Sequence, residues 1–227
     1  RSIYLAALLM AVLCFASLAL AEEEELVYNG GFEELDEYGD PAGWYTDAWI
    51  HDEGYTLFSC DNDGEAPEGE RYATIRSLDM NDARYVQEIA VEPESLYRVS
   101  CLVRGSDIES GRGANLSIGG LYAFSESVFD TDGEWVELEW YGETGEDQYS
   151  VELYVRLGGY SGESVGEAAF DKISMTRVEE IPGEMIADPW YTMNSGYNGV
   201  SVLDDGEDEA EEENARGLLV TVTILYL

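Results

Sequence analysis

Short runs in which apolar and polar residues alternate constrain the fold of this chain most. In Leu96–Arg104, alternate residues from Tyr97 to Val103 are apolar, whereas Arg98, Ser100 and Arg104 point to the other face. A β-strand turns successive side chains to opposite faces, so this pattern predicts a strand with one buried face. Similar patterns predict further strands at Arg71–Arg76, Arg84–Val91, Trp135–Tyr141, Tyr149–Leu157 and Phe170–Arg177.

The segments between these strands are rich in Gly and Asp, and nothing between Leu26 and Val178 has the 3.6-residue period of a long helix. Many short strands joined by such turns favour an antiparallel β-sandwich over a parallel α/β sheet. We therefore expect an all-β domain over residues 26–178.

The charge of the chain limits its partners. It has 49 Asp and Glu against 11 Lys and Arg, a net charge of −38, and 45% of its residues are hydrophobic. Such a surface repels phosphates, so nucleic acid and polybasic docking to lipid headgroups are not expected. The hydrophobic content is too high for a disordered acidic chain. A single histidine, His51, makes His-rich metal clusters and a histidine-dependent catalytic triad unexpected.

The first 21 residues have the pattern of a secretory signal peptide. Residues 2–21 carry no charge and end in Ala19-Leu20-Ala21, directly before four glutamates. An apolar stretch followed by an A-x-A site predicts cleavage after Ala21 and export of the protein. The alternative is a membrane anchor that is not cleaved.

Residues 179–216 resemble a linker, and residues 217–227 resemble the start of a transmembrane helix. Eight of the ten residues in Asp204–Glu213 are acidic, and Gly217–Leu227 is wholly uncharged and largely apolar. A bilayer-spanning helix needs about 20 residues, so this would be a truncated helix through which the protein reaches the membrane. The alternative is a last β-strand, because Val220 to Ile224 are β-branched.

A series of short motifs points to a known superfamily. In chain order they are Asn29–Glu33 (NGGFE), Gly43–Trp44, Tyr85–Gln87, Val91–Pro93, Tyr97–Ser100, Trp135–Val136 and Ala169–Met175 (AFDKISM). Their order and spacing resemble those of carbohydrate-binding modules of the galactose-binding-like jelly-roll superfamily. The resemblance implies a jelly roll over residues 26–178 and a non-catalytic, glycan-binding role.

A second set of segments resembles one particular setting of such a module. It comprises Gly43–Asp47, Gly113–Ser117, Tyr141–Asp147 and Arg156–Glu163. The set is similar to the extracytoplasmic N-terminal region of bacterial lipid-carrier-dependent, protein-mannosyltransferase-like glycosyltransferases. This resemblance implies a module on the outer face of the cell membrane that belongs to a membrane-bound glycosyltransferase. The alternative is a structural or adhesion spacer, anchored at the surface, that binds no sugar.

Sugar recognition requires flat aromatic faces beside planar polar groups. The predicted strand 149–157 places Glu152, Tyr154 and Arg156 in line on its polar face, as an acceptor, a platform and a donor. Trp44, Trp49 and Tyr122 are further candidate platforms near loops or strand ends. The alternative is a solvated face with a local ion pair, and tryptophans that fill the core.

In the resembled modules, a structural calcium ion joins the first and last strands. The matching residues here are the carbonyl of Gly31 and the carboxylates of Glu33 and Asp171, with Glu68 or Glu70 as a further ligand. Calcium prefers six to eight oxygen ligands. The residue after Asp171 is usually acidic in these modules, and here it is Lys172, so the resemblance departs at this position and a carboxylate ligand is missing there.

The two remaining cysteines and one pair of glutamates do not alter the predicted function. Cys60 and Cys101 remain after removal of the signal peptide, and the sequence is compatible with a disulfide or with two free thiols. Glu137 and Glu139 lie two residues apart on one strand, but nothing distinguishes this pair from the other acidic residues, so glycosidase activity is not expected.

Overall fold

Ten strands follow one another in the part of the chain that the computed structural model describes, residues 24–192. They are β1 (Tyr45–Ala48), β2 (Thr56–Asp61), β3 (Tyr72–Asn81), β4 (Ala83–Ala90), β5 (Leu96–Ser106), β6 (Ala114–Ile118), β7 (Val136–Glu143), β8 (Ser150–Leu157), β9 (Ser164–Val178) and β10 (Asp188–Pro189). This part contains no helix that could cross a membrane. The expected signal peptide, acidic run and apolar end lie outside these residues.

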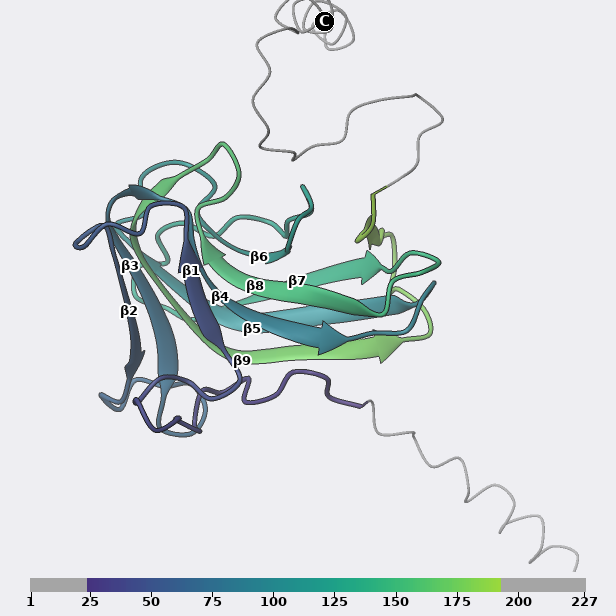
Figure 1. Cartoon of the computed structure of the whole chain (residues 1–227), viewed down its shortest axis with the longest axis horizontal. Helices are drawn as coiled ribbons and strands as arrows, with labels where there is room; N and C mark the ends of the chain where they lie inside the picture. Colours follow the sequence, from purple (N-terminus) through teal and green to yellow (C-terminus); the bar gives the residue numbers. More distant parts are fainter. Residues whose placement is uncertain (1–23, 193–227) are drawn as a thin grey trace, which may run out of the picture. The chain divides into compact units, whose positions relative to one another are not determined.

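The strands form two sheets (Figure 1). One has four strands in the order β1-β4-β8-β6, and the other has six in the order β10-β7-β5-β9-β3-β2. All neighbouring strands are antiparallel except β10 and β7. The expected all-β, antiparallel sandwich is therefore confirmed.

The core lies between the two sheets and consists of side chains at alternate strand positions. On β5 the predicted apolar face is buried as expected, since Val99 and Val103 have no exposed surface. On β8 the inward residues Leu153 and Val155 are likewise fully buried. Burial of apolar surface on this scale is the main stabilising contribution to a sandwich of this kind.

The six strands predicted from alternation correspond to β3, β4, β5, β7, β8 and β9, with shifted ends. Four strands were not predicted. The short β1 and the edge strand β2 alternate weakly, and β6 alternates between apolar and polar residues over only five positions, too few to stand out from the loops around it. The two-residue β10 lies beyond the predicted domain.

The sandwich extends past the boundary expected at Val178. Trp190, directly after β10, is fully buried and stacks on Tyr97 with ring centroids 6.1 Å apart. Its backbone N–H donates to the carbonyl of Glu143 at 2.8 Å. A Cβ at Gly142 would lie 1.8 Å from the indole, so glycine at this position makes room for the tryptophan. The first part of the expected linker therefore belongs to the domain.

Candidate functional site

The four-stranded sheet has a polar outer face, which points away from the core. On β8, Glu152, Tyr154 and Arg156 lie on this face, while the residues between them belong to the core. The alternation of this strand therefore brings together the three side chains expected to be in line. Their environments differ, because Glu152 is exposed, Tyr154 is 7% exposed and Arg156 is fully buried.

Tyr154 forms the middle of this face. It is paired with Val86 on β4 and with Ser117 on β6, and Val86 is paired with Tyr45 on β1. Directly opposed residues of antiparallel strands share a face, so these four side chains form one row across the sheet. Tyr45 is 51% exposed at the outer edge of the row. Sequence reasoning missed Tyr45, because the four residues of β1 are too few to show a period.

Glu152 accepts hydrogen bonds from two tyrosines of this face. The Tyr45 hydroxyl donates to Oε1 at 3.0 Å, and the Tyr154 hydroxyl donates to Oε2 at 2.8 Å. Burial, together with the bond to Glu152, raises the pKa of Tyr45 to about 12 and that of Tyr154 further still. Both phenols are therefore protonated donors at neutral pH. The carboxylate is held in place and keeps lone pairs that can accept from a ligand hydroxyl.

Gly119, in the turn after β6, makes this arrangement possible. A Cβ at this position would lie 2.5 Å from Glu152 Oε2 and 2.5 Å from the Tyr154 hydroxyl. Any larger residue would therefore displace one of the two groups. The glycine allows the chain to pass directly beside the acceptor.

Arg156 does not present its donors to solvent. Its Nε donates to Asp82 Oδ1 at 2.5 Å, its Nη2 bonds the other oxygen of Asp82, and its Nη1 lies 3.4 Å from Ser117 Oγ. Arg84 also pairs with Asp82, at 3.4 Å, and with Asp47. The donors of the Arg156 guanidinium are therefore engaged with the protein itself, and this side chain does not offer a ligand the free donor that the sequence predicted.

The three other aromatic candidates separate into one buried and two exposed residues. Trp44 is 7% exposed, lies 5.3 Å from the ring of Phe32 and donates through Nε1 to the carbonyl of Asn29. It therefore fills the core, the alternative left open by the sequence. Trp49, directly after β1, is 73% exposed, and Tyr122, in the loop after β6, is 71% exposed.

Three residues next to Tyr122 complete the rim of the face and were not predicted. Phe124 lies 5.1 Å from the ring of Tyr122 and 6.0 Å from that of Tyr160, in both cases edge to face. The guanidinium carbon of Arg112 lies 4.1 Å from the centre of the Phe124 ring. All three residues occupy loops or turns, where no periodicity marks a side chain as belonging to a surface.

The loop that carries Tyr122 and Phe124 is attached to the free edge of β6. Leu116 and Ser125 are joined by two hydrogen bonds of 2.9 Å, one from each backbone N–H, and Ala114 and Val128 exchange two backbone bonds of 2.8 Å. The loop therefore continues the sheet by irregular pairing. Its aromatic side chains are held in fixed positions beside the outer face.

The residues expected to bind calcium lie close together. Asp171 is buried, and its two oxygens accept the backbone N–H groups of Glu68, at 3.1 Å, and Lys172, at 2.7 Å. Glu33 Oε1 accepts two N–H groups of the same loop, from Glu70 and Arg71. A Cβ at Gly31 would lie 3.8 Å from Asp171 Oδ1, so the backbone of Gly31 passes close to this carboxylate.

These residues fit a calcium ion only in part. The Nζ of Lys172 lies 3.3 Å from Glu68 Oε2, so an ammonium group already compensates one of the carboxylates. Within residues 24–192, no group of three or more His, Cys, Asp and Glu side chains is arranged to hold a metal ion. Two carboxylates and a carbonyl are fewer than the six to eight oxygens that calcium prefers. The calcium site stays a prediction.

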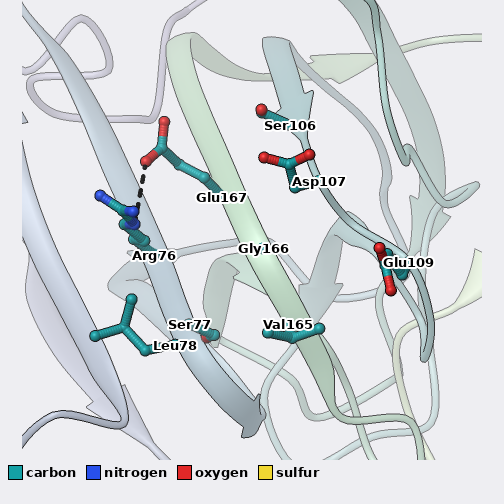
Figure 2. Close-up of a pocket in the computed structure, with 9 residues that line it drawn as sticks. All are labelled: Arg76, Ser77, Leu78, Ser106, Asp107, Glu109, Val165, Gly166 and Glu167. Atoms are coloured by element: carbon teal, nitrogen blue, oxygen red, sulfur yellow. Dashed lines mark ion pairs between the residues drawn. The ribbon is translucent and has the colours of Figure 1, made fainter.

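A separate pocket of about 440 Å³ opens on the six-stranded sheet, where the register of β3 and β9 shifts between Ser77 and Asn81 (Figure 2). Figure 2 shows Arg76 and Glu167 facing each other, with Asp107 on the other side of Glu167. The Nε of Arg76 lies 3.8 Å from Oε2 of Glu167. No aromatic side chain lines the pocket, so it lacks the flat apolar surface that a sugar ring requires.

Two other features can now be located. Arg98 lies between Glu137 and Glu139, with distances of 3.4 Å and 2.6 Å, so this pair forms a surface ion-pair group. Cys60 and Cys101 are both free thiols, and Cys101 is buried in the core, on the face that the alternation predicted.

No protein-family model matches the chain, and no curated protein sequence does. Solved structures with a similar fold include TmCBM61 in complex with β-1,4-galactotriose (20% identity, 68% of this chain and 99% of that chain, TM-score 0.48). The CBM22-1 xylan-binding domain from Paenibacillus barcinonensis Xyn10C is 15% identical over 70% of this chain and 97% of its own, with a TM-score of 0.43. A cyclase from Fischerella sp. TAU is 13% identical over 70% of this chain and all of its own (100%), with a TM-score of 0.51. At such identities the similarity concerns the fold alone, and what the chain binds has to be argued from its own residues.

Proposed function

We propose that the outer face of the four-stranded sheet binds a glycan without catalysing a reaction. The observation that carries this proposal is the combination of exposed aromatic side chains at both edges of the face with an ordered acceptor between them. Tyr45 and Trp49 stand at the β1 edge, Tyr122 stands beyond the β6 edge, and Glu152 and Tyr154 lie between them. The motif resemblance of residues 26–178 to carbohydrate-binding modules supports the same role.

The spacing of these groups suits a chain of sugars better than a single ring. Neighbouring strands are about 4.8 Å apart, so β1 and β6, at the two edges of the sheet, are separated by about 14 Å. Aromatic side chains at the two edges can therefore stack on different sugar units. Glu152, between the edges, accepts from hydroxyl groups, and its own two tyrosine bonds fix its orientation.

A glycan array followed by titration of the bound glycan tests the proposal. Replacing Trp49 or Tyr122 with Ala should weaken binding about fivefold each, since each removes roughly 1 kcal/mol of stacking. The matched control is Tyr38→Ala, because Tyr38 is 82% exposed and lies in the turn before β1, outside the four-stranded sheet. Binding that is unchanged in both site variants would reject this face as the site.

A spacer or adhesion role is the second candidate. It predicts that no glycan binds the intact protein and that the exposed aromatic residues contact another protein. Two results together would favour that role: the intact protein binds a partner protein and loses this binding on Trp49→Ala, and it binds no glycan on the array.

We also propose that the protein is exported and acts on the outer side of the cell membrane, as part of a membrane-bound glycosyltransferase. The pattern of residues 1–21, the acidic run Asp204–Glu213 and the apolar residues 217–227 support this placement. N-terminal sequencing of the secreted domain should begin at Glu22. Further coding sequence after Leu227 should contain many apolar spans, and a single span with a short basic tail would instead indicate a surface anchor.

We propose calcium, bound by Gly31, Glu33 and Asp171, as a structural ion. The proximity of the Glu33 and Asp171 carboxylates to one loop, with the Gly31 backbone beside Asp171, supports it, and the ammonium of Lys172 opposes it. Calcium binding to the folded state alone would raise the unfolding midpoint in proportion to the logarithm of its concentration. Thermal unfolding with calcium and with chelator therefore decides the question.

A further inference from the structure

Arg112 is held rigidly beside the proposed glycan site. It lies just before β6, and its guanidinium carbon is 4.1 Å from the ring centre of Phe124 and 5.0 Å from that of Tyr122. Its Nη2 donates to the Tyr122 hydroxyl, and its backbone N–H donates to the carbonyl of Gly162 at 2.9 Å. A guanidinium stacked on two rings in this way has few orientations open to it.

Two glycines on the next loop make room for this side chain. A Cβ at Gly159 would lie 2.7 Å from Arg112 Cδ, and a Cβ at Gly162 would lie 3.3 Å from Arg112 Cβ. The aliphatic part of Arg112 therefore packs directly against the loop backbone. Much of the conformational entropy that a free arginine loses on binding a ligand is lost here during folding.

Arg112 also differs from other arginines of this chain in its partners. Of the nine basic side chains between residues 24 and 192, seven form an ion pair with a carboxylate. For Arg112, no carboxylate of that part of the chain lies within ion-pair distance, although the whole sequence has 49 acidic residues. A guanidinium has five N–H donors, and the side-chain hydrogen bond found for Arg112 uses one of its nitrogens, toward Tyr122.

From these contacts we infer that the glycan carries an anionic group, a uronic acid carboxylate or a sulfate ester, and that Arg112 binds it. This inference rests on the proposed glycan site. The planar fork of a guanidinium matches the two oxygens of such a group, which makes arginine better suited than lysine to this role. A sugar stacked on Tyr122, which is 71% exposed, would bring its acidic substituent next to Arg112.

The charges of the face give the ligand a direction. Glu152 lies on β8 as an exposed acceptor, and it repels an anionic group while it accepts from hydroxyls. The acidic substituent should therefore lie at the Arg112 end of the site, and neutral hydroxyl groups should lie at the Glu152 end. Arg84 and Arg156 do not compete for the anion, because Asp82 and Asp47 already pair with them.

The test is a comparison of matched glycans by isothermal titration, with polygalacturonan against its methyl ester and glucuronoxylan against unsubstituted xylan. A sulfated galactan, compared with the same galactan without sulfate, provides the arm that separates sulfate from carboxylate. One added charge-assisted bond should make the acidic member of the preferred pair bind about five to ten times more tightly. Arg112→Met should remove this preference, so that the acidic and the neutral member of each pair bind with similar affinity.

Three further variants keep the result interpretable. Arg112→Lys keeps the charge without the fork and should retain part of the preference. Arg76→Gln removes one positive charge on the other sheet, where Arg76 pairs with Glu167, and should leave the preference intact. Glu152→Gln removes the charged acceptor and should weaken binding of the neutral glycan. Thermal unfolding of each variant confirms that it is folded.

The outcomes separate the two proposals. If neutral and acidic glycans bind equally, or if Arg112→Met keeps the preference, the inference about the anionic group is wrong and glycan binding stands. If none of these glycans binds the folded protein, the inference falls together with the proposed function.

Discussion

Replacing Asp82 with Asn tests how strongly the buried ion pair between Asp82 and Arg156 stabilises the domain. Arg156 is fully buried and Asp82 is 5% exposed, and the two are joined by a 2.5 Å bond from Nε and a second bond from Nη2. Removing one partner of a buried pair leaves an uncompensated charge and costs about 3–5 kcal/mol. Asn keeps the shape and one acceptor oxygen, so we expect a loss of about 3 kcal/mol, or about 6–12 °C in the unfolding midpoint.

The double variant separates this charge effect from packing. Arg156→Met leaves Asp82 with Arg84 as its remaining partner at 3.4 Å, so it should cost less than Asp82→Asn. Combining the two changes removes both buried charges, and the pair should then be clearly less destabilising than the sum of the single variants. The expected coupling is about 2 kcal/mol.

Unfolding in urea, followed by tryptophan fluorescence, measures these free energies without adding an ionic denaturant that would screen the charges. The core tryptophans Trp44 and Trp190 become exposed on unfolding and provide the signal. The control is Asp52→Asn at an exposed position, which should change stability by less than about 0.5 kcal/mol. A cost below about 1 kcal/mol for Asp82→Asn, or additive single effects, would refute the reasoning.

Three other predictions concern stability. Trp190→Ala should cost about 3–5 kcal/mol because the indole is fully buried. For the same reason, a chain ending at Val178 should unfold at a lower urea concentration than one ending at Thr192. Equal midpoints would place Trp190 outside the fold. Burial raises the pKa of Asp171 from 3.8 to about 6, so its contribution to stability is full below pH 3.8 and is lost as pH rises through 6. With a chelator present, the free energy of unfolding of Asp171→Asn relative to the wild type should therefore rise by up to about 3 kcal/mol between pH 4 and pH 7. Added calcium should stabilise only the wild type if the ion binds. A difference between the two proteins that does not vary with pH contradicts the pKa argument. The net charge of −38 makes the folded chain repel itself. Raising NaCl from about 0.01 M to about 1 M shortens the Debye length from about 30 Å to about 3 Å and should therefore raise the unfolding midpoint. A constant midpoint would show that the charges lie too far apart to repel.

Sequence patterns predicted those strands whose two faces meet different surroundings. On β5 and β8 one face enters the core and the other does not, so apolar and polar residues alternate. β6 alternates as well, but over only five residues, and its outward residues Asn115 and Ser117 are 0% exposed. Their polarity is satisfied by contacts such as the two bonds from Asn115 Nδ2 to the carbonyls of Gly113 and Gly158. Burial of this kind depends on tertiary contacts that no local window contains.

The residues of the candidate site also fall into those that local alternation predicts and those that depend on tertiary contacts. Glu152 and Tyr154 share a face because they lie two residues apart on one strand, and this much the alternation predicted. The role of Arg156 could not be predicted in this way, because its partner Asp82 is 74 positions away in the sequence. Arg112 and Tyr45 come from a turn and from a four-residue strand, where the pattern has no period to detect.

The positive charge of the outer face is carried by arginines that lie over aromatic rings. The guanidinium carbon of Arg84 is 5.1 Å from the ring of Tyr154, and that of Arg156 is 4.4 Å from the ring of Tyr160. A guanidinium can stack through its plane and donate at its edge at the same time, which an ammonium group cannot do. The edges of these two arginines are neutralised by aspartates, whereas among residues 24–192 the edge of Arg112 donates to a phenol and pairs with no carboxylate. Within this face, Arg112 is therefore the position that attracts an anion although the chain as a whole repels anions. We expect it to determine whether the site prefers a glycan with a negatively charged substituent.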